Sequence, residues 1–260
     1  MQEKVFTVRQ SLSIYALIIV LFYISSIFFQ SRYGLMGIPL TQLFGLLLPG
    51  LIMVLMLKKN FQSVFFLNKT DSYKWYWIGL LLWLIALIAS SIYASYAIEF
   101  LPEETELLDA FNYIFENVSL TNQILMIAVL PAIVEELLFR GLFLSSFLKY
   151  TKPSTAIIAT ALMFAAMHFS LLKLVTTFIL GCTFGYVVYK SKSIFPSIFL
   201  HFINNAFSVL IVKYLSEFEF VEPLILFQNN MTVLLSGTLL FIAIVIMAHE
   251  RGFYHNHLTE

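Results

Sequence analysis

The chain has 260 residues, of which 60% are hydrophobic and only 12% are charged, and its mean hydropathy is +0.88. A water-soluble globular protein of this size needs a more polar surface, so the composition excludes that class and indicates an integral membrane protein. The 15 Lys and Arg residues balance the 15 Asp and Glu residues, so net charge gives no argument for a nucleic-acid partner. The one cysteine, Cys182, cannot form an internal disulfide, and packing is its expected role.

Eight apolar stretches are long enough, or nearly so, to cross a bilayer, which requires about 20 mostly apolar residues. The sequence therefore predicts an all-α, polytopic membrane protein with about eight transmembrane helices. No repeat or linker divides the chain, so residues 1–260 are expected to form a single membrane domain. In chain order, the stretches are 12–29, 37–57, 76–98, 122–148, 155–171, 174–190, 194–215 and 230–248.

The distribution of basic residues gives an independent test of this count. If the N-terminus is cytoplasmic and all eight stretches cross, the inner side holds eleven of the 15 basic residues, and the outer side holds Arg32, Lys173 and Lys213. Because cytoplasmic loops are enriched in Lys and Arg, this split favours eight spans with both termini cytoplasmic. The loop at about 99–121 has no basic residue and is expected to be either a short interfacial helix or a solvated acidic loop.

The fourth stretch carries three ionisable side chains, Glu135, Glu136 and Arg140. Each costs about 2.5–3.5 kcal/mol at the centre of a membrane helix even on a lenient scale, so a function is expected of them. Glu136 and Arg140 are four residues apart and can pair along the helix. This pair would neutralise the guanidinium and leave Glu135, about 100° round the helix, free for chemistry.

Two later stretches add imidazoles and an amide. His168 lies near the end of the fifth stretch, whereas His201 and Asn205 share one face of the seventh. Taken singly, a histidine can simply bond a neighbouring carbonyl, and an asparagine can link two helices. Taken with the two glutamates, these groups lie on three stretches and predict one polar catalytic pocket within the bundle.

This set of side chains suits peptide hydrolysis. A carboxylate assisted by an imidazole can deprotonate water, and a second imidazole with an amide N–H can stabilise the oxyanion of a tetrahedral intermediate. We favour a mechanism without a cofactor. A divalent metal such as zinc remains the alternative, with Glu135, His168 and His201 as its ligands, although the chain has no H-E-x-x-H motif.

The same residues form three ordered motifs. They are E-E-x-x-x-R from Glu135 to Arg140, F-x-x-x-H from Phe164 to His168, and H-x-x-x-N from His201 to Asn205. Together they resemble the motifs of the CAAX protease and bacteriocin-processing family of intramembrane endopeptidases, also called the Abi family. The resemblance covers about residues 122–210, which it marks as the catalytic core.

The resemblance implies an eight-span α-helical endopeptidase. By motif, Glu135 would activate water with help from His168, while His201 and Asn205 would hold the oxyanion. Its substrates would be hydrophobic or lipid-anchored peptides at the lipid bilayer. A bacterial plasma-membrane location is expected, where the implied roles are maturation of peptides or bacteriocins and self-immunity.

The resemblance also implies that Glu136 and Arg140 organise the site. Two hypotheses without peptidase activity stay open. One is a membrane scaffold or bacteriocin self-immunity protein on the same fold. The other is a proton-coupled carrier that uses the Glu and His side chains as a relay, which is disfavoured because no inverted repeat is evident.

Overall fold

The computed structural model of the chain describes residues 6–56, 58, 60–104, 106, 114–115 and 117–214. Within these residues the fold is all-helical with no strands, which confirms the predicted class. The eighth predicted stretch, 230–248, lies outside the described residues. The helices are α1 (Val8–Tyr33), η1 (Gly34–Met36), α2 (Gly37–Thr41), η2 (Gln42–Leu47), α3 (Leu48–Met56), α4 (Phe61–Val64), α5 (Lys74–Phe100), α7 (Leu120–Gln123), η3 (Ile124–Val129), α8 (Leu130–Glu136), η4 (Leu137–Phe143), α9 (Leu144–Tyr150), α10 (Pro153–Ala166), α11 (Leu171–Ser191) and α12 (Phe195–Tyr214).

Long apolar helices dominate the described part of the chain. Their outward faces carry large apolar side chains such as Ile27, Met56 and Trp77, which are 72%, 72% and 70% exposed. Such a surface suits lipid and not water, in agreement with an integral membrane protein. The count of eight spans stays a prediction. Four described segments are long and apolar enough to cross a membrane, namely Val8–Met56, Lys74–Ala97, Leu171–Ser191 and Phe195–Tyr214.

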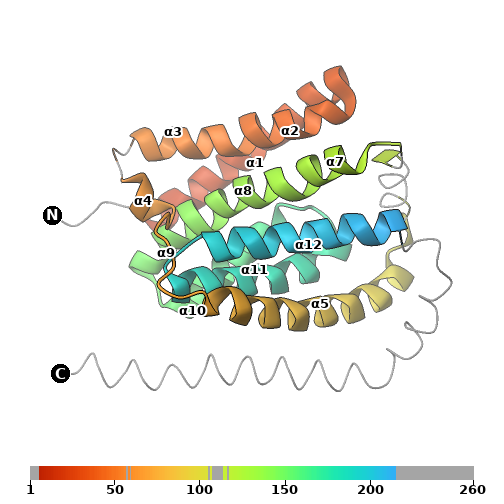
Figure 1. Cartoon of the computed structure of the whole chain (residues 1–260). Coiled ribbons are helices and arrows are strands. Elements are labelled where there is room, and N and C mark those ends of the chain that lie inside the picture. The colour runs from red at the N-terminus through yellow and green to blue at the C-terminus, as the bar shows by residue number, and fades with distance from the viewer. Residues whose placement is uncertain are drawn as a thin grey trace, which may run out of the picture.

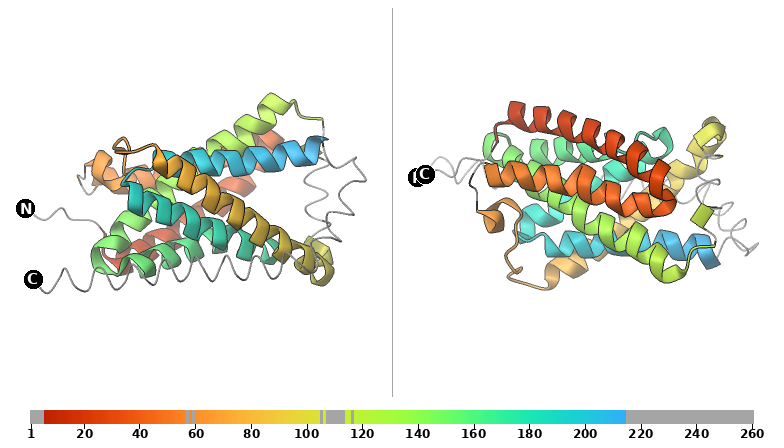
Figure 2. Two further views of the ribbon diagram at one scale, coloured as in Figure 1. Left: turned by 60° about the horizontal axis from the view of Figure 1, so that its bottom comes forward. Right: turned by 90° about the horizontal axis from the view of Figure 1, so that it is seen from above.

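The first of these segments is a helical hairpin. It turns at Gly34, which has a positive φ of 57°, and the helices on either side lie next to each other (Figure 2). At Gly37 an added Cβ would lie 2.5 Å from the backbone of Phe29, so only glycine permits this approach. The two arms, α1 and α2–α3, correspond to the predicted stretches 12–29 and 37–57.

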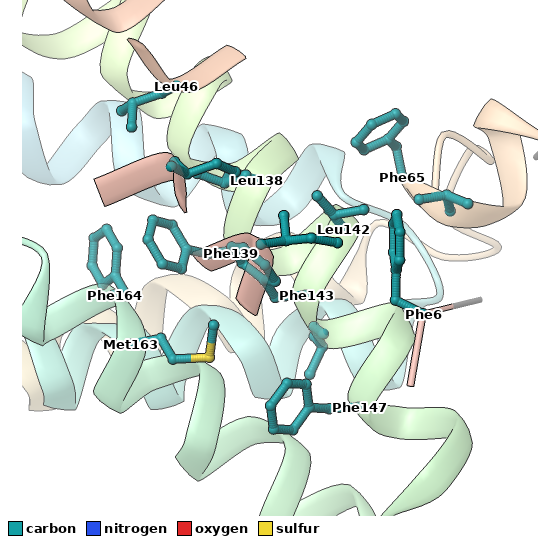
Figure 3. Packing of buried hydrophobic residues seen from close by; sticks show 14 of the residues in the cluster. Phe6, Leu46, Phe65, Leu138, Phe139, Leu142, Phe143, Phe147, Met163 and Phe164 are labelled. Carbon is teal, nitrogen blue, oxygen red and sulfur yellow. The ribbon is translucent and has the colours of Figure 1, made fainter. Parts of the chain in front are cut away.

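The helix from α7 to α9 is the centre of the fold. Its α8 part runs between the hairpin and the helices α12, α11 and α5 (Figure 1). Its η4 part places Phe139 and Phe143 in a core where neither is exposed (Figure 3). Phe139 meets Phe164 of α10 edge to face, with ring centroids 5.2 Å apart, and Tyr15 of α1 donates a hydrogen bond of 2.6 Å to the carbonyl of Met163. The helices α1 and α10 thereby pack against each other and against the helix with the two glutamates, where Tyr15 also meets Phe139 and Phe143 edge to face.

The turn between α10 and α11 lies at residues 167–170, a few residues before the break between the predicted stretches 155–171 and 174–190. The helix stops because Phe169 adopts a left-handed φ of 45° and Ser170 caps the next helix. Glu104 closes the same turn. Its carboxylate accepts hydrogen bonds from the Ser170 hydroxyl at 2.6 Å and from the N–H groups of Leu171 and Leu172 at 2.8 and 3.0 Å.

Small residues bring α10 and α11 together. A Cβ added at Gly181 would lie 2.9 Å from Cβ and 3.0 Å from Cα of Ala161. At Gly185, one turn further along the same face, the nearest atom would be the Cγ2 methyl of Ile157, at 3.3 Å. The contact at Gly181 is therefore backbone-limited, whereas the contact at Gly185 involves the end of a flexible side chain.

We expect Gly181→Ala to destabilise the protein by about 1–3 kcal/mol, because the added methyl group forces α10 and α11 apart. Gly185→Ala is the matched control and should cost less, since the Ile157 side chain can shift. Thermal unfolding in detergent measures both. Equal stability of the two variants would contradict the close-approach argument.

We expect the stability of the turn at residues 167–170 to depend on pH through Glu104. Hydrogen bonds from Ser170, and then from the backbone of Leu172 and Leu171, hold the pKa of Glu104 below its ordinary value. A carboxyl with a lowered folded-state pKa contributes stability above its unfolded pKa and loses it as the pH falls through the folded pKa. Acidification should therefore raise amide hydrogen exchange at Leu171 and Leu172 relative to the intrinsic exchange rate at each pH.

Glu104→Gln should remove most of this pH dependence, and exchange should already be fast at neutral pH. Glu103→Gln is the control, because Glu103 is exposed and adjacent in sequence. If the amide exchange of wild type and Glu104→Gln changed equally on acidification, Glu104 would not be the group that caps the start of α11.

Candidate active site

Glu136 is the buried centre of a cluster of polar side chains. Its carboxylate is 0% exposed and accepts three hydrogen bonds. Arg140 Nη1 and His201 Nδ1 both lie 2.9 Å from Oε1, and the Ser197 hydroxyl donates to Oε2. The predicted pairing of Glu136 with Arg140 is thus present. Both oxygens of the Glu136 carboxylate therefore accept hydrogen bonds, as a buried carboxylate in an apolar environment requires.

Arg140 ties this carboxylate to two further helices. Its Nη2 donates to the backbone carbonyl of Gly181 in α11 at 3.3 Å. Its guanidinium carbon lies 4.4 Å from the ring centroid of Phe164 in α10 and 5.4 Å from that of Phe184 in α11. Ring faces attract a cation most strongly where water is excluded. Arg140 therefore fixes the positions of α10 and α11 around the site.

Glu135 has a different environment from its neighbour. Its side chain is 14% exposed, and Oε1 accepts a hydrogen bond of 3.3 Å from Gln42 Nε2. On the other side, Oε2 lies 3.8 Å from His201 Nε2. The 100° offset between successive helical residues is the reason that the Glu136 carboxylate is bonded by Ser197 and His201 of α12, while the Glu135 carboxylate also reaches the hairpin. Glu135 thus has fewer donors and more access than Glu136.

The ring of His201 bridges the two glutamates. Nδ1 meets the Glu136 carboxylate at 2.9 Å and Nε2 faces the Glu135 carboxylate at 3.8 Å. An ionised carboxylate only accepts hydrogen bonds, so the tautomer with a proton on Nδ1 is assigned from the Glu136 contact. The ring stacks on Phe184 at 5.4 Å and meets Phe164 edge to face at 5.8 Å. Its orientation is therefore fixed on every side.

His168 lies in the turn after α10. Its Nδ1 lies 2.9 Å from the carbonyl oxygen of Phe164, so Nδ1 carries the proton and Nε2 is the free acceptor of a neutral ring. The ring is partly buried, stands edge to face on Phe164 and interacts electrostatically with Glu135. Position and tautomer both leave Nε2 available to accept a proton.

Asn205 is held by a chain of hydrogen bonds. Trp83, which can only donate, bonds the Asn204 carbonyl oxygen at 3.1 Å, and the Asn204 amide then donates to Asn205 Oδ1 at 3.2 Å. This order fixes the amide of Asn205, whose Nδ2 donates to the carbonyl of Ile127 at 3.1 Å. That carbonyl lacks its ordinary α-helical donor because residue 131 is a proline. One of the two Nδ2 hydrogens remains for another acceptor.

The predicted site residues thus fall into two groups. The first group is linked through His201 and Glu136: His201 faces Glu135 and bonds Glu136, and Glu136 pairs with Arg140. His168 interacts with Glu135 electrostatically, with no hydrogen bond or ion pair between them in the described part of the chain. Asn205 is bonded to Ile127 and not to the glutamates or His201 within the described contacts. The catalytic roles of these side chains and an open polar pocket stay predictions.

Sequence reasoning missed three side chains that complete the site, namely Gln42, Ser197 and Trp83. Ser197 had a signal, because it lies four residues before His201 on the same helical face. Gln42 had one as well, as a lone amide in an apolar stretch. Trp83 had none, since a tryptophan in a membrane helix is unremarkable until its partner is known.

The metal-dependent alternative requires Glu135, His168 and His201 to converge on one ion. In the described part of the chain, no group of three or more His, Cys, Asp and Glu side chains is arranged to hold a metal ion. Glu135, His168 and His201 therefore do not fit a metal site as they lie.

Comparison with known families gives one match. Residues 117–207 match the family model described as type II CAAX prenyl endopeptidase Rce1-like. This match holds all three motifs and confirms the resemblance to the CAAX proteases, a family of membrane peptidases. Comparisons with curated proteins and with solved structures give no match.

We expect Glu136→Gln to destabilise the protein by about 3–5 kcal/mol, because it leaves Arg140 as a buried charge without its counter-ion. Ser197→Ala is the matched control. It removes one donor to the same carboxylate and should cost about 1–3 kcal/mol. Thermal unfolding in detergent compares them. If Glu136→Gln were no less stable than Ser197→Ala, Glu136 would not be the centre of the cluster.

Proposed function

We propose that the protein is an intramembrane endopeptidase that hydrolyses peptide bonds with a water molecule activated by Glu135. The observation that carries this proposal is the unequal environment of the two adjacent carboxylates. Glu136 is saturated by three donors and fully buried, whereas Glu135 is more exposed and has one hydrogen bond. Membership of residues 117–207 in a peptidase family supports the same reaction class.

Glu135 and His168 are proposed to activate the water. Glu135 takes one proton of the water, and the neutral His168 ring assists by sharing that same proton, because its Nε2 is unprotonated. The water oxygen then forms a bond to the carbonyl carbon of the substrate. The electron pair of the C=O double bond moves to oxygen and gives a tetrahedral oxyanion.

His201 and Asn205 are proposed to stabilise that oxyanion. His201 Nε2 faces Glu135 at 3.8 Å, so it lies where an oxyanion would form next to the attacking water. For Nε2 to donate, the ring must carry both protons, and the Glu136 carboxylate on Nδ1 is the counter-charge for that form. The second Nδ2 hydrogen of Asn205 is the other donor. Collapse of the intermediate breaks the C–N bond, and the proton held by Glu135 passes to the leaving amine.

Hydrophobic or lipid-anchored peptides are the proposed substrates. The cluster lies among long apolar helices with lipid-compatible outer faces, so a substrate that partitions into the bilayer would reach it at high local concentration. We also propose a bacterial plasma-membrane location with both termini cytoplasmic, on the basis of the basic residues in the loops. Maturation of peptides or bacteriocins is the physiological role that fits this location.

We expect Glu135→Gln to abolish cleavage while the protein still inserts and folds. The measurement is hydrolysis of a library of hydrophobic peptides, with prenylated and unprenylated members, by purified protein in lipid nanodiscs. Loss of the water-activating group should lower the rate by about 10²–10⁴-fold. Thermal unfolding should change by less than about 1 kcal/mol, since Glu135 has one neutral hydrogen-bond partner.

A parallel sample with a strong chelator distinguishes the two mechanisms. Unchanged activity supports the metal-free mechanism, and loss that is restored by added metal supports the metal-dependent alternative. Full activity of Glu135→Gln would refute its role. A wild-type protein without activity on any peptide would instead favour the scaffold or self-immunity hypothesis.

A further inference from the structure

Gln42 lies on a face of the hairpin that is otherwise apolar and tightly packed. Gln42, Leu46 and Gly50 recur at intervals of four residues along η2 and α3, and η2 packs against α8. Leu46 is 1% exposed, and a Cβ added at Gly50 would lie 3.3 Å from a methyl group of Leu138. An amide on such a face loses its hydration, which is costly unless both of its ends find partners.

Among the described residues, only one end of this amide has a hydrogen-bond partner. The side chain of Gln42 is 9% exposed, and its Nε2 donates to Glu135 Oε1 at 3.3 Å. Its carbonyl oxygen, Oε1, is buried and has no hydrogen-bond partner among the described residues. The opposite amide orientation would place an acceptor against the Glu135 carboxylate, so the contact fixes which end is the donor. An unpaired acceptor is thus held next to the carboxylate that the proposed function uses as the base.

We propose that Gln42 is a positioning residue for the attacking water, an inference that rests on the proposed function. Its Oε1 accepts one hydrogen of the water while Glu135 accepts the other. With both hydrogens held, a lone pair of the water oxygen points toward the carbonyl carbon of the substrate. On attack, the proton facing Glu135 is transferred to that carboxylate, and the hydrogen bond to Gln42 is retained. Gln42 itself neither gains nor loses a proton.

The amide is suited to this role because it carries a donor and an acceptor on one rigid plane. The donor keeps the Glu135 carboxylate in place, and the acceptor orients the water. Gln42 lies outside the residues 117–207 that match the family model, so the N-terminal hairpin supplies part of the site. On the opposite side of Glu135, Oε2 faces His201 Nε2 at 3.8 Å.

The test compares single-turnover and steady-state hydrolysis by wild type, Gln42→Met and Gln42→Glu, with Glu135→Gln as the inactive reference. Gln42→Met keeps the size of the side chain and removes both hydrogen-bonding ends. Gln42→Glu keeps the shape and an acceptor but removes the N–H that bonds Glu135, and it serves if the methionine variant fails to fold. We expect kcat and the single-turnover rate to fall about 10- to 100-fold in both, with KM within about twofold of wild type.

Gln123→Met is the control for loss of a buried glutamine. Its amide donates to the carbonyls of Phe115 and Val118 and does not contact Glu135. This variant should lose thermal stability but keep the wild-type kcat in the folded fraction.

The outcomes separate this inference from the proposed function. If wild type cleaves, Glu135→Gln does not, and the Gln42 variants keep the wild-type kcat, the inference is wrong and the proposed function stands. A change in KM alone, or a loss that only follows the folded fraction, also overturns it. If wild type shows no hydrolysis, both fail together.

Discussion

A buried carboxylate in an apolar environment needs an opposite charge and hydrogen-bond donors to offset its lost hydration, and the rest of this structure depends on how Glu136 obtains them. Arg140, His201 and Ser197 all donate to its two oxygens. These donors come from η4 and α12, and Arg140 reaches on to the backbone of Gly181 in α11. Because the desolvated charge must keep all of its partners, the helices that carry them have little freedom to move.

Because the Glu136 carboxylate is fully hydrogen-bonded, Glu135 is the carboxylate of the pair that is left with room for another partner. Two adjacent glutamates on one helix cannot face the same direction, so one is drawn into the cluster and the other points toward the hairpin and His201. The two histidines differ in a corresponding way. His168 has its Nδ1 on a neutral carbonyl, whereas His201 has its Nδ1 on a carboxylate, and this contrast favours a proton acceptor on one side of Glu135 and a donor on the other.

Irregular points in the helices supply the remaining contacts. Pro131 lacks the N–H that would bond the Ile127 carbonyl, and Asn205 donates there instead. Phe169 adopts a left-handed conformation in the turn after α10 that carries His168, and Glu104 anchors the start of α11 on the other side of that turn. These departures from a regular helix bring polar groups of the backbone to the site without exposing them to lipid.

The sequence by itself determined the membrane class, the all-helical fold, the motif residues and the pairing of Glu136 with Arg140. Composition shows whether the surface of a protein faces lipid or water. Helix geometry places residues four apart on the same face, where their side chains can pair. Only the tertiary structure decided that Gln42 bonds Glu135, that Ser197 and His201 share Glu136, and that Trp83 orients Asn205 through Asn204. These contacts join residues 61 to 121 positions apart. The spacing of residues in the chain cannot specify such contacts, because they depend on how the helices pack against one another.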